Sequence, residues 1–172
     1  MNKILETDRL YLREMKQSDF NSLCAFLQDA NVMYAYEHAF SDDEVQAWLD
    51  NQIRRYKKDG FGLWAIIKKD TGECIGDCGL TMQDANGKQV IEIGYHLQKK
   101  YWHMGYATEC AIACKEYAFN ILNVKEVFSI IRDNNIPSKK VAIRNGMTIC
   151  DRFTKHYYNM DMPHVVFSVK NR

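Results

Sequence analysis

The sequence predicts an α+β domain of three layers, in which about four helices cover a mixed, mainly antiparallel sheet of seven strands. Three observations lead to this prediction. Runs of alternating apolar and polar residues predict strands. The turn sequences Asp70-Thr71-Gly72 and Asn86-Gly87 join three of these strands as antiparallel hairpins. A later apolar helix separates two strands, which makes that pair parallel.

The N-terminal third is predicted to hold one strand and two helices. Leu10 and Leu12 alternate with larger, more polar side chains, as in a strand with one buried face. A first helix is expected over residues 18–28. A second helix begins at Ser41, which forms a capping box with Glu44 and precedes an apolar stripe at helical spacing.

The middle of the chain is predicted to form three antiparallel strands, over residues 63–68, 74–81 and 89–97. A helix over 107–122 follows them. It is apolar on most sides and carries several alanines, so we expect it to pack closely on the sheet.

The C-terminal part begins with the strand of the parallel pair, expected over residues 126–132. A short helix follows, which Asn135 caps and Asn145-Gly146 ends. Two last strands are expected over residues 148–153 and 164–169.

Composition limits the kinds of partner. With 172 residues and 47% hydrophobic content, the chain is expected to form a single domain over residues 1–172. Its 23 Lys and Arg residues against 22 Asp and Glu residues give no reason to expect nucleic acid or an anionic membrane as partner. We find no signal-like start and no apolar run of the roughly 18 residues that a membrane span needs, so we expect a cytoplasmic protein.

Six cysteines are present, and we expect six free thiols that are mostly buried. The segment from Cys74 to Cys78 lacks the spacing and the second half of a zinc site, and Cys110 and Cys114 lie four apart in an apolar helix. No metal is therefore expected.

A strand over residues 91–97 leads through a turn at Gly105 into the helix over 107–122. The first N–H groups of a helix have no partner within the helix and lie at the positive end of its dipole. Gly105 allows the backbone to approach a ligand closely. This junction is therefore predicted to bind a phosphate group.

The window from Trp102 to Ala107 resembles the acyl-CoA pyrophosphate loop of the GNAT superfamily of N-acetyltransferases, Gln/Arg-x-x-Gly-x-Gly/Ala. Trp102 replaces the leading Gln/Arg, and Tyr-Trp-x-x-Gly-Tyr-Ala-Thr-Glu is the form of this loop in the ribosomal-protein N-terminal acetyltransferase branch. The segment from Asn135 to Met147 resembles that branch's Asn-x-x-Ser-x-x-Val-Ala-x-x-x-Gly-Phe. The order of the expected elements also matches the family over almost the whole chain.

The resemblance implies transfer of an acetyl group from acetyl-CoA to a primary amine, by direct attack in a ternary complex. Acetyl-CoA would lie in a V-shaped gap where the strands over 89–97 and 126–132 splay apart. The residues implied to bind it are Tyr95, Leu97, His103, Met104, Gly105, Tyr106, Ala107, Thr108, Asn135 and Ser138.

Three residues are candidates for proton transfer. Glu92 corresponds in place to the general base of many family members, and the alternative is a strand carboxylate paired with a cation. His96 shares a strand face with Glu92 and could relay the proton. Many family members protonate the CoA thiolate with a Tyr where this chain has Ala142. Ser138 is therefore the candidate donor, unless its hydroxyl only bonds the helix backbone.

Five residues are expected to border the acceptor site, four between the two early helices and one before the last strand: Tyr34, Tyr36, Glu37, His38 and Tyr157. Glu37 would suit a cationic acceptor or would be a solvated carboxylate. The acceptor is expected to be a protein N-terminal α-amine or a small-molecule amine. An α-amine costs ~1.4 kcal/mol to neutralise at pH 7, against ~4.6 kcal/mol for lysine.

Two other classes of function are alternatives. A non-catalytic acyl-CoA-binding sensor or scaffold would keep Gly105 but would need neither Glu92 nor Ser138. A nucleotide-phosphate binder ranks last, because the sequence has no P-loop and no complete Gly-x-Gly-x-x-Gly. A monomer and a homodimer are both compatible with the sequence.

Overall fold

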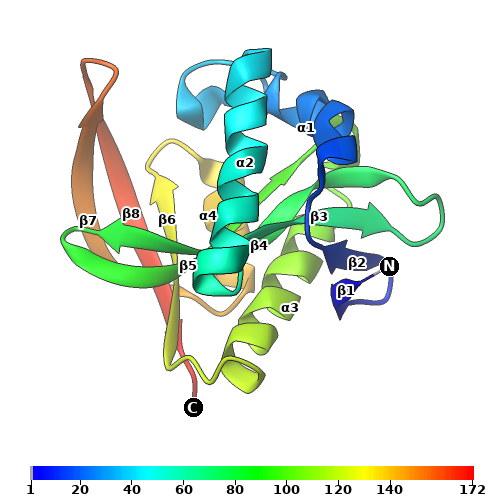
Figure 1. Cartoon of the computed structure of the whole chain (residues 1–172). Coiled ribbons are helices and arrows are strands. Elements are labelled where there is room, and N and C mark those ends of the chain that lie inside the picture. Colours follow the sequence, from blue (N-terminus) through cyan, green and yellow to red (C-terminus); the bar gives the residue numbers. More distant parts are fainter. Residues whose placement is uncertain (1) are drawn as a thin grey trace.

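The computed structural model describes residues 2–172, apart from the side chain of Tyr157. Its strands form one sheet in the order β1-β2-β3-β4-β5-β6-β8-β7 (Figure 1). All neighbouring strands are antiparallel except β5 and β6, which are parallel. The predicted class, a mixed and mainly antiparallel sheet with four α-helices, is confirmed.

The strands are β1 Lys3–Glu6, β2 Leu10–Arg13, β3 Leu63–Lys68, β4 Cys74–Ala85, β5 Lys88–Leu97, β6 Glu126–Arg132, β7 Thr148–Tyr157 and β8 Met160–Lys170. The α-helices are α1 Phe20–Leu27, α2 Asp42–Asp59, α3 Tyr106–Asn120 and α4 Ile136–Arg144. Three short 3-10 helices are η1 Gln17–Asp19, η2 Tyr34–Tyr36 and η3 Lys99–Tyr101.

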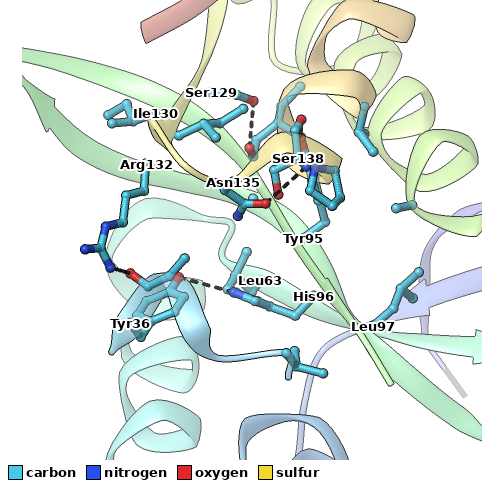
Figure 2. Close-up of a pocket in the computed structure, with 18 of the residues that line it drawn as sticks. Tyr36, Leu63, Tyr95, His96, Leu97, Ser129, Ile130, Arg132, Asn135 and Ser138 are labelled. Atoms are coloured by element: carbon cyan, nitrogen blue, oxygen red, sulfur yellow. Dashed lines mark hydrogen bonds between the residues drawn. The ribbon is translucent and has the colours of Figure 1, made fainter. Parts of the chain in front are cut away.

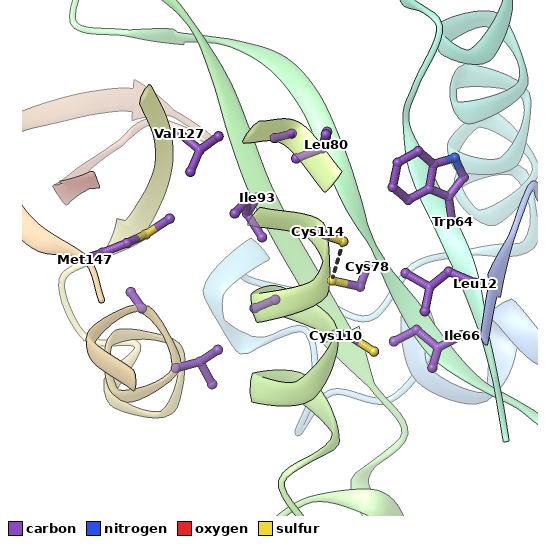
Figure 3. Close-up of a cluster of buried hydrophobic side chains, with 14 of the residues drawn as sticks. Leu12, Trp64, Ile66, Cys78, Leu80, Ile93, Cys110, Cys114, Val127 and Met147 are labelled. Atoms are coloured by element: carbon purple, nitrogen blue, oxygen red, sulfur yellow. Dashed lines mark hydrogen bonds between the residues drawn. The ribbon is translucent and has the colours of Figure 1, made fainter. Parts of the chain in front are cut away.

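The sheet is the middle of three layers, and β3 shows how the sequence specifies this. Leu63, Ala65 and Ile67 pack into a core beneath α1 and α2. Trp64 and Ile66 point to the other face and pack into the core beneath α3 (Figure 3). Because both faces of the strand are buried, β3 reads as an unbroken apolar run.

The start of α2 is fixed as predicted. The Ser41 hydroxyl accepts a hydrogen bond from the Glu44 N–H over 3.2 Å, and the Glu44 carboxylate accepts one from the Ser41 N–H over 3.1 Å. This capping box satisfies two of the N–H groups that a helix start leaves free. The acidic first turn of α2 therefore has a structural explanation.

The sheet has eight strands, so the predicted count of seven is wrong. The additional strand, β1, is a four-residue edge strand that pairs only with β2. The first helix is also shorter than expected, because residues 17–19 form the 3-10 turn η1 before α1 begins at Phe20.

The last two strands are longer than predicted. We expected strands over residues 148–153 and 164–169, with Tyr157 in the connection between them, but β7 continues to Tyr157 and β8 begins at Met160. Tyr158 and Asn159, both with φ of 54°, form the two-residue turn between them. The extended backbone therefore replaces the expected loop before the last strand.

All six cysteines are free thiols, as predicted. Four of them are buried, while Cys24 is half-buried and Cys150 is exposed. Cys78 and Cys114 bring their sulfur atoms to 3.7 Å inside the core between the sheet and α3 (Figure 3). Burial raises the pKa of the Cys78 thiol, so it packs as a small apolar group.

Among residues 2–172, no helix combines the length and the apolar character that crossing a membrane requires.

Candidate functional site

A cavity of about 810 Å³ lies where β5 and β6 separate. Its walls come from η2 and α2 on one face of the sheet, from the turn before α3, and from the start of α4 (Figure 2). The cavity also reaches the side chains of Arg55, on α2, and Lys155, on β7, beyond Glu92 as seen from the turn before α3. The cavity is therefore a passage along the split in the sheet.

The split begins at Glu92. Only the pair Glu92 and Phe128 is in parallel register between β5 and β6 in the described chain. Just beyond it, side chains replace the backbone ladder: the Ile130 N–H donates to Glu92 Oε2 over 2.6 Å, and the Ser129 hydroxyl donates to the Ile93 carbonyl over 2.9 Å. From there to Leu97, the gap side of β5 faces the cavity instead of a strand.

Glu92 has an acid–base character unusual for a carboxylate. Burial raises its pKa from 4.5 to about 7. The hydrogen bond from Ile130 and the charges of Lys155, His96 and Arg55 lower the pKa, but burial outweighs them. No described residue donates a hydrogen bond to Oε1 of Glu92, and the side chain lines the cavity. Glu92 can therefore exchange a proton with a ligand near neutral pH.

His96 belongs to a chain of three polar side chains. Its Nδ1 lies 2.7 Å from Oδ1 of Asp77, and its Nε2 lies 3.2 Å from the Tyr36 hydroxyl (Figure 2). Because a carboxylate only accepts, Nδ1 carries the proton, and in the neutral ring Nε2 accepts from Tyr36. Asp77 is fully buried, and Trp48 Nε1 donates to its second oxygen over 3.1 Å. The ring of His96 is thus fixed in one tautomer and orientation.

The turn before α3 has the backbone that the sequence predicts. Gly105 is the N-cap residue with φ of 81°, and no side chain caps the helix. The N–H groups of Tyr106, Ala107 and Thr108 consequently have no intrahelical partner, and all three residues line the cavity. His103, with φ of 63°, adds a second left-handed residue to the turn.

Arg9 supports this turn from beneath. Its guanidinium donates to the Met104 carbonyl over 3.0 Å and to Glu109 over 2.7 Å, and it lies 4.2 Å from the centre of the Tyr106 ring. The Thr7 hydroxyl also donates to Glu109 over 2.6 Å. The connection between β1 and β2 thereby fixes the turn that faces the cavity.

The start of α4 forms the wall opposite this turn. Asn135 Oδ1 accepts from the Ser138 N–H over 3.2 Å and from the Tyr34 hydroxyl over 2.8 Å. The Tyr95 hydroxyl donates to the Ser138 carbonyl over 2.8 Å. The Ser138 hydroxyl itself bonds none of the described residues and lines the cavity. Ala142 is buried in the core, so no hydroxyl comes from that position.

The segment around η2 is tied across the cavity to the end of β6. Arg132 forms an ion pair with Glu37 and contacts the carbonyls of Tyr34 and Ala35. The charge of Glu37 is thus compensated within the protein, which argues against the expectation that Glu37 binds a cationic acceptor. His38 lies 2.8 Å from Glu44, outside the cavity.

Three basic side chains line the cavity, one just before the turn that leads into α3 and two on α4: Lys99, Lys140 and Arg144. None of them has a carboxylate partner on the cavity wall, because Lys99, Lys140 and Arg144 appear in no ion pair among the described residues. Together with the free N–H groups of α3, they make this end of the cavity suited to an anion.

The structure brings most of the predicted site residues to one cavity. Those that line it are Tyr34, Tyr36, Glu92, Tyr95, His96, Leu97, His103, Gly105, Tyr106, Ala107, Thr108, Asn135 and Ser138. Met104, Glu37 and His38 lie outside it, and the side chain of Tyr157 is outside the described residues. The exposed Met104 contributes its carbonyl to the contact with Arg9 instead.

Sequence reasoning missed Asp77 and Arg55. Asp77 could have been found, because an acidic residue inside an apolar strand has to be buried with a partner. Arg55 lies on a helix face that carries many charges, and the sequence alone does not distinguish it from its neighbour Arg54. Within the described residues, no group of His, Cys, Asp or Glu side chains is arranged to hold a metal ion.

The site combines a split between two parallel strands, a helix start that no side chain caps, and a buried carboxylate. These features indicate an α+β protein that binds a ligand in the split, and similarity to known proteins identifies its family. Residues 9–148 match the family model of the acetyltransferase (GNAT) domain. The chain belongs to this family of N-acetyltransferases. The predicted family is thus confirmed.

Individual relatives agree with this assignment. The chain is 34% identical over 140 residues to the uncharacterized N-acetyltransferase p20 of Bacillus licheniformis, covering 80% of this chain and 78% of that protein. A crystal structure of an acetyltransferase from Agrobacterium tumefaciens is 26% identical, with a TM-score of 0.81 and coverage of 97% and 94% of the two chains.

A third likeness is to RimL, a ribosomal alpha-N-protein acetyltransferase solved in complex with coenzyme A. It has a TM-score of 0.81 over 98% of both chains but only 15% identity, so it shows a shared fold.

Proposed function

We propose that this protein transfers the acetyl group of acetyl-CoA directly to a primary amine, and that residues 1–172 act as one catalytic domain. The observation that carries the proposal is the position of Glu92, a carboxylate with a pKa of about 7, at the point where β5 and β6 separate. A base at that point can take a proton from an amine that attacks a thioester held in the gap. The family relationship supports the same reaction.

The ends of the cavity suit the two substrates differently. The phosphates of acetyl-CoA match the free N–H groups of α3 and the cations Lys99, Lys140 and Arg144. The acyl chain would run along the gap side of β5 toward Glu92, where unpaired backbone N–H groups can polarise the thioester carbonyl. The acceptor amine would enter between Glu92 and η2, near Tyr34 and Tyr36.

Glu92 is the proposed general base, and the chain of Asp77, His96 and Tyr36 is a proton path beside it. A carboxylate with a pKa near 7 is half ionised at neutral pH, so it accepts a proton without an unfavourable equilibrium. Both ring nitrogens of His96 have polar partners, Asp77 and Tyr36, so the ring could pass a proton between its two sides in this scheme.

The function is tested by calorimetric titration with acetyl-CoA, with ATP and NAD as controls, followed by an acetylation assay over a panel of amines. We expect 1:1 binding selective for acetyl-CoA and release of CoA that requires an amine. Absence of binding would contradict the proposal. Binding without transfer to any amine would favour a non-catalytic sensor or scaffold.

Replacing Gly105 should weaken acetyl-CoA binding. A residue with a Cβ at φ of 81° costs about 1–3 kcal/mol of backbone strain, and the added atom would lie 3.4 Å from Arg9 Nη2. We expect Gly105→Ala to raise the dissociation constant for acetyl-CoA about 10-fold, measured by calorimetry. Gly87→Ala is the matched control, since Gly87 has φ of 88° in a remote hairpin with open space around it. Equal affinities in both variants would remove Gly105 from the proposed site.

Ser138→Ala tests the proposed proton donor to the leaving thiolate. A thiolate with a pKa near 8.5 leaves fairly well unaided, so the expected loss of kcat is only about 10-fold. The affinity for acetyl-CoA should not change, because the backbone N–H of residue 138 still donates to Oδ1 of Asn135 and the start of α4 keeps its cap. Unaltered turnover in single-turnover experiments would assign Ser138 a structural role.

A further inference from the structure

The cavity wall carries an excess of positive charge at the end where the acceptor would enter. Glu92 is the only carboxylate among the described residues that line the cavity. At its end of the cavity lie Arg55, from α2, and Lys155, from β7. Their charges both act on Glu92, which places them around the same space.

Neither cation has a carboxylate within ion-pair distance in the described part of the protein, although the charges of Asp59 and Glu92 act on Arg55. Arg55 and Lys155 are half-buried and form no ion pair with any described carboxylate. By contrast, Arg132, which also lines the cavity, is paired with Glu37. A half-buried guanidinium without a counter-ion is costly, and burial lowers the pKa of Arg55.

Arg55 is also held in place. Its Nη1 donates to Oε1 of Gln52 over 3.3 Å, and the same oxygen accepts from the Leu63 N–H over 3.0 Å. Gln52 is fully buried, so it links the guanidinium to the backbone of β3. This arrangement orients a charged group toward the cavity before any ligand arrives.

These two cations are too far from the proposed phosphate end to serve the CoA phosphates. Glu92 and Leu97 are five residues apart on one strand, which corresponds to about 16 Å. Lys99 and the start of α3 follow Leu97, whereas Arg55 and Lys155 surround Glu92. A separate anionic group on a ligand would compensate these cations at the Glu92 end.

We infer that the acceptor is an amine that also carries a carboxylate, and that Arg55 and Lys155 bind this carboxylate while Glu92 faces the amine. The inference rests on the proposed acetyl transfer and narrows its substrate class. Opposite charges on acceptor and wall would place the nitrogen near the base. Free amino acids and peptides with an acidic side chain near the N-terminus both offer this chemistry. Polyamines and aminoglycosides, which bring only positive charge, do not.

The test compares matched acceptors that differ in the carboxylate, with kcat/KM calculated per neutral amine because a free α-carboxylate raises the pKa of the adjacent amine. Leucine is paired with leucinamide, and alanyl-aspartyl-alanine amide is paired with alanyl-asparaginyl-alanine amide, with spermidine as a cationic acceptor. Because charge-assisted hydrogen bonds contribute about 1.5–3 kcal/mol, we expect kcat/KM to favour the carboxylate member of at least one pair by about 10- to 100-fold. The pair that shows the preference identifies whether a main-chain or a side-chain carboxylate is bound.

Variants distinguish binding of the acceptor's carboxylate from an effect of the two cations on the pKa of Glu92. In Arg55→Gln combined with Lys155→Gln, the preference within the favoured pair should fall to about unity. If the cations only tune the base, both members of the pair should lose activity equally and the preference should persist. Arg54→Gln is the matched control, because Arg54 is exposed on the same helix and does not line the cavity.

Failure of the inference differs visibly from failure of the proposed function. Acetyl-CoA binding with equal transfer to both members of each pair, or with spermidine preferred, would overturn only the carboxylate inference. Absence of acetyl-CoA binding would overturn the proposed function as well.

Discussion

Glu92→Gln is expected to lower kcat/KM for the amine acceptor by about 10²- to 10⁴-fold, the range typical of a general base. The substitution is nearly isosteric, and the amide oxygen can still accept from the Ile130 N–H. The wild-type pH profile should rise through a pKa near 7, because the ionised carboxylate is the active form. In the variant, only the limb set by the acceptor amine should remain.

A stability measurement gives an independent check on Glu92. The folded protein holds this carboxyl at a pKa of about 7, above the 4.5 of the unfolded chain. Its contribution to the free energy of unfolding is therefore full below pH 4.5 and is lost as the pH rises through about 7. Chemical denaturation of Glu92→Gln should lack this decline.

Two further variants serve as controls for the kinetic measurement on Glu92→Gln. Asp84→Asn changes an exposed carboxylate on β4 outside the cavity and should leave kcat/KM unchanged. His96→Asn removes the rival proton acceptor. A larger loss with His96→Asn than with Glu92→Gln, or a rising limb that persists in Glu92→Gln, would transfer the role of base to His96.

Asp19→Ala is expected to reduce the free energy of unfolding by about 3–5 kcal/mol. Arg13 donates to both oxygens of Asp19 over 2.8 Å, and the side chains are only 12% and 6% exposed. Without Asp19, the guanidinium would remain buried and uncompensated. Its Nε has no hydrogen-bond partner among the described residues even with Asp19 present.

Urea denaturation measures this effect, and its pH dependence identifies the cause. Burial alone would raise the pKa of Asp19, but the bonds from Arg13 and from the Lys16 N–H outweigh it and lower the pKa. The contribution of the pair is therefore present above the unfolded pKa of 3.8 and is lost as the pH falls through the folded value. Asp19→Asn, which keeps the shape, replaces Asp19→Ala if that variant does not fold.

An exposed ion pair on the surface serves as the comparison for the buried pair of Arg13 and Asp19. Asp70 is 70% exposed and lies 3.3 Å from Lys68. Because water and salt screen such a pair, Asp70→Ala should hardly change the denaturation midpoint. Equal effects of Asp19→Ala and Asp70→Ala would contradict the role assigned to the buried pair.

Local signals in the sequence explain why most of the fold was predictable. The Ser41 and Glu44 cap, the Asn86-Gly87 turn and the Asn135 cap act over a few residues, and all three form as expected. Short β1 lacks such a signal. Its two half-buried residues, Ile4 and Leu5, are adjacent and lie between two exposed residues, so β1 shows no alternation. The turn at Tyr158 and Asn159 also lacks the glycine that marks most tight hairpins.

The site was predictable where a motif specified the backbone, as at Gly105, and where strand periodicity placed Glu92 and His96 on one face. Contacts between distant segments were not predictable. The ion pair of Arg132 with Glu37 joins residues 95 positions apart in the sequence. Such pairing depends on how the whole chain packs, which no local pattern encodes.

Because β5 and β6 share a single register pair, the sheet consists of two groups of strands that are only weakly joined. Strands β1 to β5 form one antiparallel group, and β6, β8 and β7 form another. In the plane of the sheet, backbone pairing between the groups is confined to Glu92 and Phe128. A cosubstrate that filled the gap would span this seam and act as a removable brace between the groups. At 100 times its dissociation constant it would add about 2.7 kcal/mol to the stability of the folded chain.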